Sequence, residues 1–181
     1  EEYRYIFGFE ESYGYLAGTY VRDKDAVVAS LLICEMGAYY RSIGMSLLDA
    51  REAMYKKYGN YVHTVESFTC EGASGMEEMA KIMDDLHANT PDSIAGFKVV
   101  KVADYLSSVT TDLATKKTEP ITLPKSDVIC STLENGATVI IRPSGTEPKI
   151  KAYYTTIAAN RADAEALSKK LSADFKAKLG F

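Results

Sequence analysis

Two strand-like segments enclose a short polar loop, and this arrangement constrains the fold more than any other feature of the chain. Residues 137–141 (ATVII) and 150–154 (IKAYY) are rich in β-branched and aromatic side chains, which favour extended structure. The loop between them reads RPSGTEPK, residues 142–149. An arginine, two hydroxyls and a glycine that exposes backbone N–H groups are the donors that suit a phosphate dianion. A turn shaped by Pro and Gly alone needs neither Arg142 nor the hydroxyls. The loop therefore predicts phosphate binding.

A second polar loop follows the apolar residues 5–7 and reads GFEESYG, residues 8–14. Neighbouring carboxylates with a hydroxyl beside them are typical of sites that recognise sugar hydroxyls. A solvated acidic turn is the alternative, and for an isolated Glu-Glu-Ser we would prefer it. Because a phosphate loop occurs elsewhere in the chain, we interpret Glu10, Glu11 and Ser12 as sugar ligands. The two loops together indicate a sugar phosphate.

These segments resemble, in order and across nearly all 181 residues, the C-terminal part of an α-D-phosphohexomutase of the phosphoglucomutase/phosphomannomutase family. Residues 8–14 resemble the family's sugar-binding loop, in the Glu-Glu-Ser form typical of glucose-phosphate enzymes. Residues 22–25 (RDKD) resemble the segment that opens the next helix of the third domain. Residues 142–149 resemble the phosphate-binding loop of the fourth domain.

The resemblance implies reversible transfer of phosphate between the 1- and 6-positions of a hexose through a hexose 1,6-bisphosphate. It also implies a phosphorylatable serine in a Thr-Ala-Ser-His-Asn-Pro-like loop and a magnesium loop of the form Asp-Gly-Asp-x-Asp. Neither motif occurs in this chain. We therefore expect a fragment that is inactive alone, holds no metal, and has as partner the missing N-terminal domains of the same polypeptide, with Mg²⁺ bound there.

By the same resemblance, each candidate residue has a role. The resemblance implies that the phosphate that is not reacting is held by Arg142, Ser144, Gly145, Thr146 and Lys149. Those that contact hydroxyls are Glu10, Ser12 and Glu11. Arg22 and Lys24 add positive charge near the transferring group, and Lys24 is also a candidate proton donor or acceptor. Solvent-exposed surface charge is the alternative for Lys24, Lys149 and Lys151, and Glu147 is expected to be structural.

Composition restricts the other classes of function. A net charge of −4 argues against a nucleic-acid partner, because no basic field would attract one. No apolar run reaches the ~20 residues that cross a bilayer, and no signal-peptide pattern opens the chain. The three cysteines, Cys34, Cys70 and Cys130, lie far apart in apolar segments, which suits buried, reduced thiols. We expect a soluble cytoplasmic protein.

The hydrophobic pattern divides the chain near Gly59. Residues 1–59 are interpreted as the C-terminal portion of the third, sugar-binding α/β/α domain. They should contain a strand over 3–9 and a helix from Asp23 or Lys24 to residue 43, which is expected to be buried in the parent enzyme. A second helix should cover 46–58 and open with a capping-box-like pair, Ser46 and Asp49.

Residues 60–181 are interpreted as the fourth, phosphate-binding α+β domain. Strands are expected over 61–70, 97–102, 128–133, 137–142 and 150–157, with Asn135-Gly136 as a hairpin turn. One helix should begin at Ser74, which forms a capping pair with Glu77, and end before Pro91. A second helix should begin at Asn160. Residues 107–127 are expected to form a long surface connection. The predicted result is a mostly antiparallel four-stranded sheet with two helices on one side.

Two other interpretations remain open. One is a phosphopentomutase or amino-sugar mutase fragment, since a loop sequence does not decide ring size or distinguish glucose from mannose. The other is a non-catalytic phospho-sugar-binding module. A chain that begins halfway through a domain argues against such a module.

Overall fold

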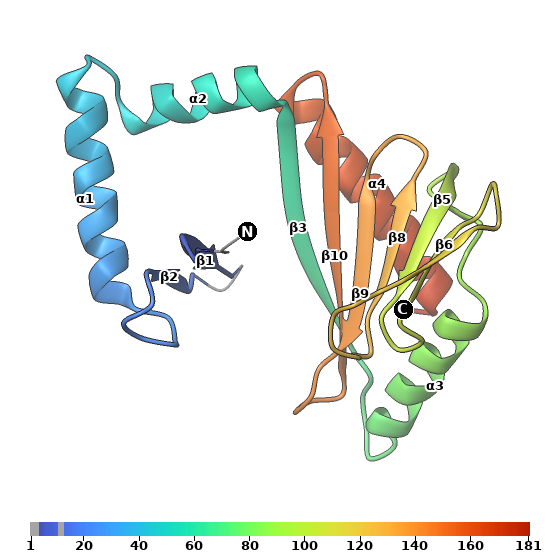
Figure 1. Cartoon of the computed structure of the whole chain (residues 1–181). Coiled ribbons are helices and arrows are strands. Elements are labelled where there is room, and N and C mark those ends of the chain that lie inside the picture. Colours follow the sequence, from blue (N-terminus) through green and yellow to red (C-terminus); the bar gives the residue numbers. More distant parts are fainter. Residues whose placement is uncertain (1–3, 11–12) are drawn as a thin grey trace. The chain divides into compact units, whose positions relative to one another are not determined.

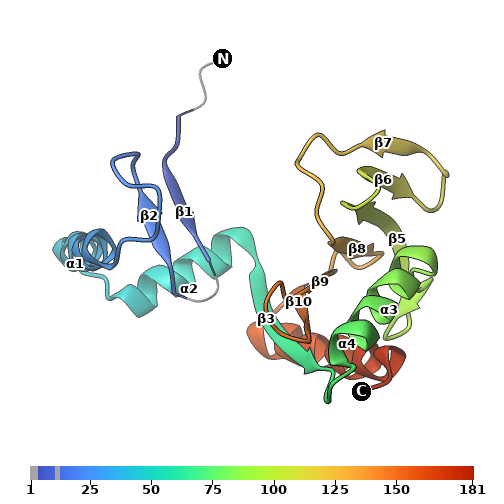
Figure 2. The ribbon, with the colours of Figure 1, turned by 90° about the horizontal axis from the view of Figure 1, so that it is seen from below.

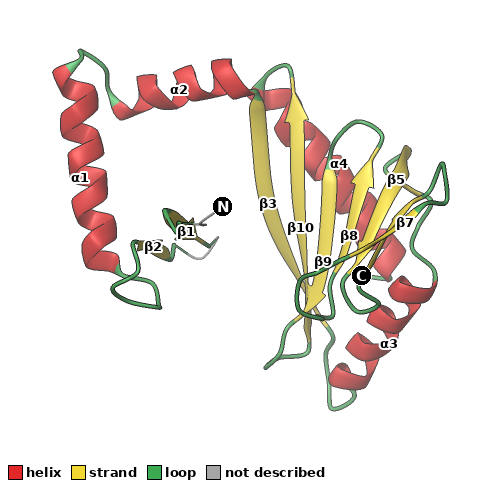
Figure 3. Cartoon of the chain, viewed as in Figure 1, coloured by secondary structure: helices red, strands yellow, loops and turns green. Residues whose placement is uncertain are grey.

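The computed structural model describes residues 4–10 and 13–181. These residues form two compact units, 1–58 and 59–181, and the division lies between helix α2 and strand β3 (Figure 1). Figure 3 shows that the first unit is mainly helical, whereas the second is built on a large sheet.

The first unit contains a hairpin and two helices. Strands β1 (Phe7–Phe9) and β2 (Tyr15–Ala17) pair antiparallel, so the predicted strand over 3–9 is shorter in its described part and has a partner that the sequence did not reveal. Helix α1 (Ala26–Ser42) starts two or three residues after the predicted start at Asp23 or Lys24, because the side chain of Asp25 accepts from the N–H groups of its first turn.

The capping pair predicted for the second helix is confirmed. In α2 (Leu47–Tyr58), the Ser46 N–H donates to Asp49 Oδ2 at 2.8 Å, and the Asp49 N–H donates to Ser46 Oγ at 3.1 Å. No single helix in the described part of the chain is long and apolar enough to cross a membrane. Only α1 and α2 taken together, with an 85° bend between them, meet the criteria of length and composition.

Helix α1 presents apolar side chains to solvent in this chain. No residue of α1 is buried, and Val27 and Leu31 are 80% and 58% exposed. The prediction that Cys34 is buried is wrong here, because it lies on this uncovered helix. Cys70 is buried and Cys130 is partly buried, and burial raises the pKa of both thiols.

The second unit is one antiparallel sheet with two helices. Its strands are β3 (Asn60–Thr69), β4 (Ser93–Ile94), β5 (Phe97–Asp104), β6 (Val109–Asp112), β7 (Thr118–Pro120), β8 (Ile129–Leu133), β9 (Thr138–Pro143) and β10 (Lys149–Ala158). Their order is β3-β10-β9-β8-β5-β6-β7, with β4 paired to β5. Helices α3 (Gly75–Ala88) and α4 (Arg161–Leu179) lie on the same side of the sheet (Figure 2).

The predicted four-stranded sheet is too small, since the sheet has eight strands. All five segments predicted as strands are strands. The segment 107–127, predicted as a surface connection, adds β6 and β7 at the edge of the sheet. Its threonines are β-branched and suit extended structure, and Lys116 takes a left-handed conformation with φ of +58° in the turn between the two strands.

The core lies between the sheet and the two helices. Along β10, alternate side chains are fully buried against the helices: Ile150, Ala152, Tyr154 and Thr156. The helices contribute Met79, Met83, Leu171 and Phe175 to the same cluster. The intervening residues of β10 point to the opposite side of the sheet, here named the outer face.

Two of the predicted local signals are confirmed and one is wrong. The Gly136 N–H closes the β8–β9 hairpin on the Leu133 carbonyl at 2.9 Å, and only the glycine of the Asn-Gly pair takes a positive φ. Asn160 caps α4 by accepting from the Asp163 N–H. Ser74 makes no side-chain cap on α3, because its ψ of 5° is far from the extended conformation that caps use.

His87 connects three elements of the second unit. It lies in the last turn of α3, and its side chain is 11% exposed. Its Nε2 is 2.8 Å from Asp127 Oδ1 in the segment before β8, and its Nδ1 is 3.0 Å from Asp104 Oδ1 at the end of β5. This histidine therefore connects the C-terminal end of α3 to the end of β5 and to the segment before β8.

We expect His87→Leu to destabilise the protein by about 1.5–3 kcal/mol, because it removes the hydrogen bond to the Asp127 carboxylate and the 3.0 Å contact with Asp104. Thermal and urea unfolding measure the change. The matched control is His63→Leu at an exposed position of β3, expected to change stability by less than ~0.5 kcal/mol. Equal effects of the two substitutions would show that the contacts of His87 do not stabilise the fold.

Candidate functional site

The predicted phosphate loop connects β9 to β10 as the end of a hairpin. The Ser144 N–H donates to the Lys149 carbonyl at 2.7 Å, and the Lys149 N–H donates to the Glu147 carbonyl at 2.7 Å. These two bonds close the base of the loop and leave its tip outside the sheet. Gly145 and Thr146 at the tip are exposed.

The donors of the tip have no protein partner. Among the described residues, the N–H groups of Gly145 and Thr146 have no acceptor, and neither do the hydroxyls of Ser144 and Thr146. A Cβ on Gly145 would have no protein atom within 4 Å, and its φ does not require glycine. The missing side chain therefore leaves space outside the protein, where an anion can approach the backbone.

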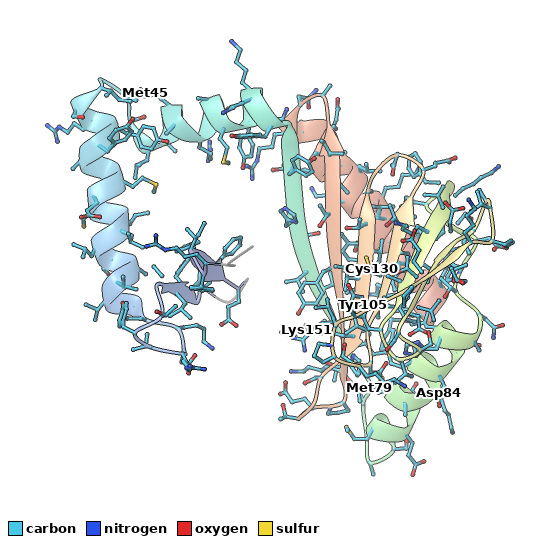
Figure 4. All side chains as sticks on the ribbon, viewed as in Figure 1. Met45, Met79, Asp84, Tyr105, Cys130 and Lys151 are labelled. Carbon is cyan, nitrogen blue, oxygen red and sulfur yellow. The ribbon has the colours of Figure 1, made fainter. Side chains whose placement is uncertain are left out.

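Two cations face each other on the outer face next to this loop. In the β9–β10 register, Arg142 is directly opposite Lys151, which Figure 4 labels. Like charges in this position destabilise a sheet unless an anion compensates them. Within the described residues, Arg142 has no carboxylate partner. Its Nε donates to the Tyr153 hydroxyl at 3.2 Å.

Lys149 is paired with a carboxylate of the same loop. Its Nζ lies 3.1 Å from Glu147 Oε2 and 3.2 Å from Oε1. The carboxylate of Glu147 is thus held by the lysine that follows it, in agreement with the structural role expected for this residue.

The segment between β3 and α3 packs against the loop at residues 142–149. The Cys70 N–H donates to the Pro148 carbonyl at 2.8 Å. A Cβ on Gly75, the first residue of α3, would collide with the Cys70 carbonyl oxygen and lie 3.1 Å from Pro148 Cβ. Only glycine allows α3 to start this close to the loop.

The predicted sugar loop is the turn of the β1–β2 hairpin. The Glu10 N–H donates to the Gly14 carbonyl at 2.9 Å, so Glu10 stands at the base of the turn. Glu11 and Ser12, the other two predicted sugar ligands, lie outside the described residues. The hollow beside the hairpin has a volume of about 240 Å³, and its lining includes Glu10, Arg22 and Lys24.

Lys24 crosses over Gly14 to reach this hollow. Its Nζ is 3.0 Å from Asp23 Oδ1 and 3.8 Å from Glu10 Oε1. A Cβ on Gly14 would collide with the lysine stem and lie 2.7 Å from Glu10 Oε1. The carboxylate of Asp23, and to a lesser extent that of Glu10, raises the pKa of Lys24. The lysine is therefore a permanent cation at neutral pH.

Helix α1 is fixed beside the hairpin through its cap. The Asp25 N–H donates to the Tyr15 carbonyl at 2.8 Å, and the Tyr20 hydroxyl donates to Asp25 Oδ2 at 2.9 Å. The Tyr20 bond, followed by the N–H groups of the first helical turn, holds the pKa of the Asp25 carboxyl below its usual range. The cap therefore places Lys24 at the hollow.

The structure thus groups the predicted residues in two places. Glu10, Arg22 and Lys24 share the hollow of the first unit, and the predicted phosphate ligands share one loop in the second. The contact of Tyr153 with Arg142 was not predicted, although an aromatic residue at this position of the next strand is a sequence signal for it. No group of three or more His, Cys, Asp or Glu side chains that could hold a metal occurs in residues 4–10 and 13–181.

Comparison with known proteins is consistent with this geometry. Residues 1–58 match the family model described as phosphoglucomutase/phosphomannomutase, alpha/beta/alpha domain III. The phosphoglucomutase of Staphylococcus epidermidis is 40% identical over 154 residues, which cover 85% of this chain and 28% of that protein. The phosphoglucomutase of Staphylococcus aureus strain RF122 is 42% identical over 150 residues, which cover 83% and 27%.

A solved structure shares the fold. The open form of pp63/parafusin, a phosphoglucomutase from Paramecium, superposes with a TM-score of 0.55 at 15% identity and covers 93% of this chain and 30% of that one. This chain spans somewhat more than a quarter of the length of its curated relatives. With about 40% identity to phosphoglucomutases over most of its length, the chain belongs to the phosphoglucomutase/phosphomannomutase family, the α-D-phosphohexomutases, and corresponds to a C-terminal part of such a protein.

Proposed function

We propose that this chain supplies the sugar-hydroxyl and distal-phosphate ligands of a phosphohexomutase that interconverts hexose 1-phosphate and hexose 6-phosphate through a bisphosphate. Residues 1–59 would be the end of its third domain, and residues 60–181 its fourth domain. The relatives named phosphoglucomutase and the Glu10-Glu11-Ser12 sequence support a glucose phosphate as substrate.

One observation carries this proposal: the loop tip offers backbone N–H groups and hydroxyls without partners, next to an arginine without a carboxylate. The chain as a whole is acidic, with a net charge of −4, so an anion is captured here by local donors and not by a general field. Charge-assisted bonds from Arg142 and neutral bonds from Ser144, Gly145 and Thr146 would complete the coordination of a phosphoryl group.

These contacts suit the phosphate that is not reacting. In a mutase the bisphosphate must bind in both orientations, so one site has to accept either phosphate while the other reacts. Donors that belong to the backbone and to short hydroxyls recognise the phosphoryl group itself and not the carbon that bears it. Binding energy from this remote site orients the reacting end and raises its rate.

At the hollow of the first unit, Glu10 would accept hydrogen bonds from sugar hydroxyls, and Arg22 would supply positive charge. Arg22 has no carboxylate partner among the described residues. Because neighbouring carboxylates raise the pKa of Lys24, we assign it the role of a fixed cation that stabilises transferring charge, in preference to a general base.

The remaining parts of the reaction are assigned to the longer protein. The metal and the phosphoserine would belong to the longer protein, since neither the Asp-Gly-Asp-x-Asp motif nor the serine motif occurs in this sequence. The uncovered apolar residues of α1 support the missing domains of the same polypeptide as the partner. The cytoplasm is the proposed location.

We expect Arg142→Ala to weaken binding of inorganic phosphate to the 181-residue chain by about 1.5–3 kcal/mol, because charged hydrogen bonds are lost. Titration calorimetry measures the affinity. Arg161→Ala is the matched control, since Arg161 is an exposed arginine of the same unit and pairs with Glu165. Unchanged affinity in Arg142→Ala would place the anion elsewhere.

We expect Asp23→Asn to lower the pKa of Lys24 toward its ordinary value, because the nearer carboxylate contributes most to raising it. Glu10→Gln should lower this pKa by a smaller amount, since its oxygen is 3.8 Å away. Titration of the lysine ¹³Cε signal by NMR follows both changes, with Glu52→Gln on α2 as the control. A larger effect of Glu10→Gln than of Asp23→Asn would contradict this order.

We expect the 181-residue chain alone to convert no glucose 1-phosphate to glucose 6-phosphate, because neither the serine motif nor the metal motif occurs in its sequence. A coupled assay for glucose 6-phosphate tests this, with a complete phosphoglucomutase as the positive control. Turnover that persists after further purification and disappears in Arg142→Ala would contradict the assignment of catalysis to the missing domains.

A further inference from the structure

Arg142 and Tyr153 are diagonal neighbours on the outer face. In the β9–β10 register, Arg142 is opposite Lys151, and Tyr153 is two residues further along β10, opposite Ile140. Diagonal positions across a strand pair are ~7–8 Å apart, within reach of a long side chain and an aromatic ring. The sheet therefore brings the two side chains together.

The contact between them has two parts. The Nε–H of Arg142 donates to the Tyr153 hydroxyl at 3.2 Å. The guanidinium carbon lies 5.8 Å from the centroid of the Tyr153 ring, within the range of a cation–π contact. A hydrogen bond to Nε together with the ring contact restricts the rotation of a side chain that is otherwise exposed.

The tyrosine is itself firmly held. Strand β10 pairs with β3 on one edge and with β9 on the other, and Tyr153 has a partner residue on both sides. The preceding residue, Ala152, and the following one, Tyr154, are fully buried in the core. The tyrosine thus presents its hydroxyl from a rigid strand.

Without such a contact, Arg142 would have little to fix it. It has no carboxylate partner among the described residues, and the ammonium of Lys151 lies opposite it and repels it. A flexible arginine loses rotamer freedom when it binds an anion, and this loss reduces affinity. A side chain held in place before binding avoids that loss.

We infer that Tyr153 is a positioning residue for the phosphate site. Its hydroxyl takes the Nε–H of Arg142 and leaves the two terminal NH₂ groups of the guanidinium to the phosphoryl group at the tip of the loop. Tyr153 acts through Arg142 and makes no contact with the ligand. The inference rests on the proposed function of the loop.

A double-mutant cycle in the 181-residue chain tests this role, with inorganic phosphate as the probe and calorimetry as the measurement. We expect Tyr153→Phe, which keeps the ring and removes the hydroxyl, to weaken phosphate binding by about three- to tenfold. In the Arg142→Ala background the same change should have no further effect. Tyr61→Phe, an exposed tyrosine on the outer face of β3, is the matched control and should bind phosphate as the wild type does.

A second measurement reports the arginine directly. The Nε–H signal of Arg142 should be protected from water exchange in the wild type and in Tyr61→Phe, and should exchange faster in Tyr153→Phe. Melting curves show whether each variant is folded, and a merely structural role of Tyr153 would change them without changing this signal.

The possible outcomes separate this inference from the proposed function. If Arg142→Ala binds phosphate as well as the wild type, the phosphate site itself is wrong. If Arg142→Ala weakens binding but Tyr153→Phe does not, the site stands and the positioning role is wrong. If Tyr153→Phe weakens binding equally with and without Arg142, the tyrosine contacts the anion itself, and the inference is also overturned.

Discussion

The pairing of β10 along both of its edges is the constraint on which the second unit depends. Ten consecutive residues of this strand match β3, and six match β9. Because the register is fixed on both sides, each residue of β10 is assigned to one face of the sheet. Residues that face the helices fill the core, and Lys149, Lys151, Tyr153 and Thr155 lie on the outer face. The core and the candidate anion site are thus two faces of the same strand.

This arrangement explains how an acidic protein presents Arg142 without a carboxylate partner among the described residues. Arg142 lies opposite Lys151 on the outer face, while the buried residues of the same strands fill the core. The loop after β9 is held by backbone bonds: two at its base, and one from the Cys70 N–H to the Pro148 carbonyl. The donors at its tip are therefore not needed to hold the loop and stay without protein partners. Stability and ligand recognition use different faces of the same hairpin.

In the first unit, the N-terminal cap of α1 positions the candidate site residue Lys24, as strand β10 does for the residues of the second unit. Asp25 is bonded to the hairpin, to Tyr20 and to the first turn of α1, so the residues just before the helix have a defined position. Lys24 can then lie across Gly14, which has no side chain to obstruct it. Its ammonium, held protonated by nearby carboxylates, is a local cation at a hollow that also contains Glu10.

Local signals in the sequence by themselves determined the ends of elements and the two loops. Ser46 with Asp49, Asn135 with Gly136, and Asn160 act within a few residues, so their chemistry can be read without the fold. Strands β2, β6 and β7 were missed, because short edge strands depend on a partner that lies nearby only after folding. Only the tertiary structure decided which donors remain without partners and that Tyr153 meets Arg142. Those facts depend on the register between strands, and the register is set by burial across the whole sheet.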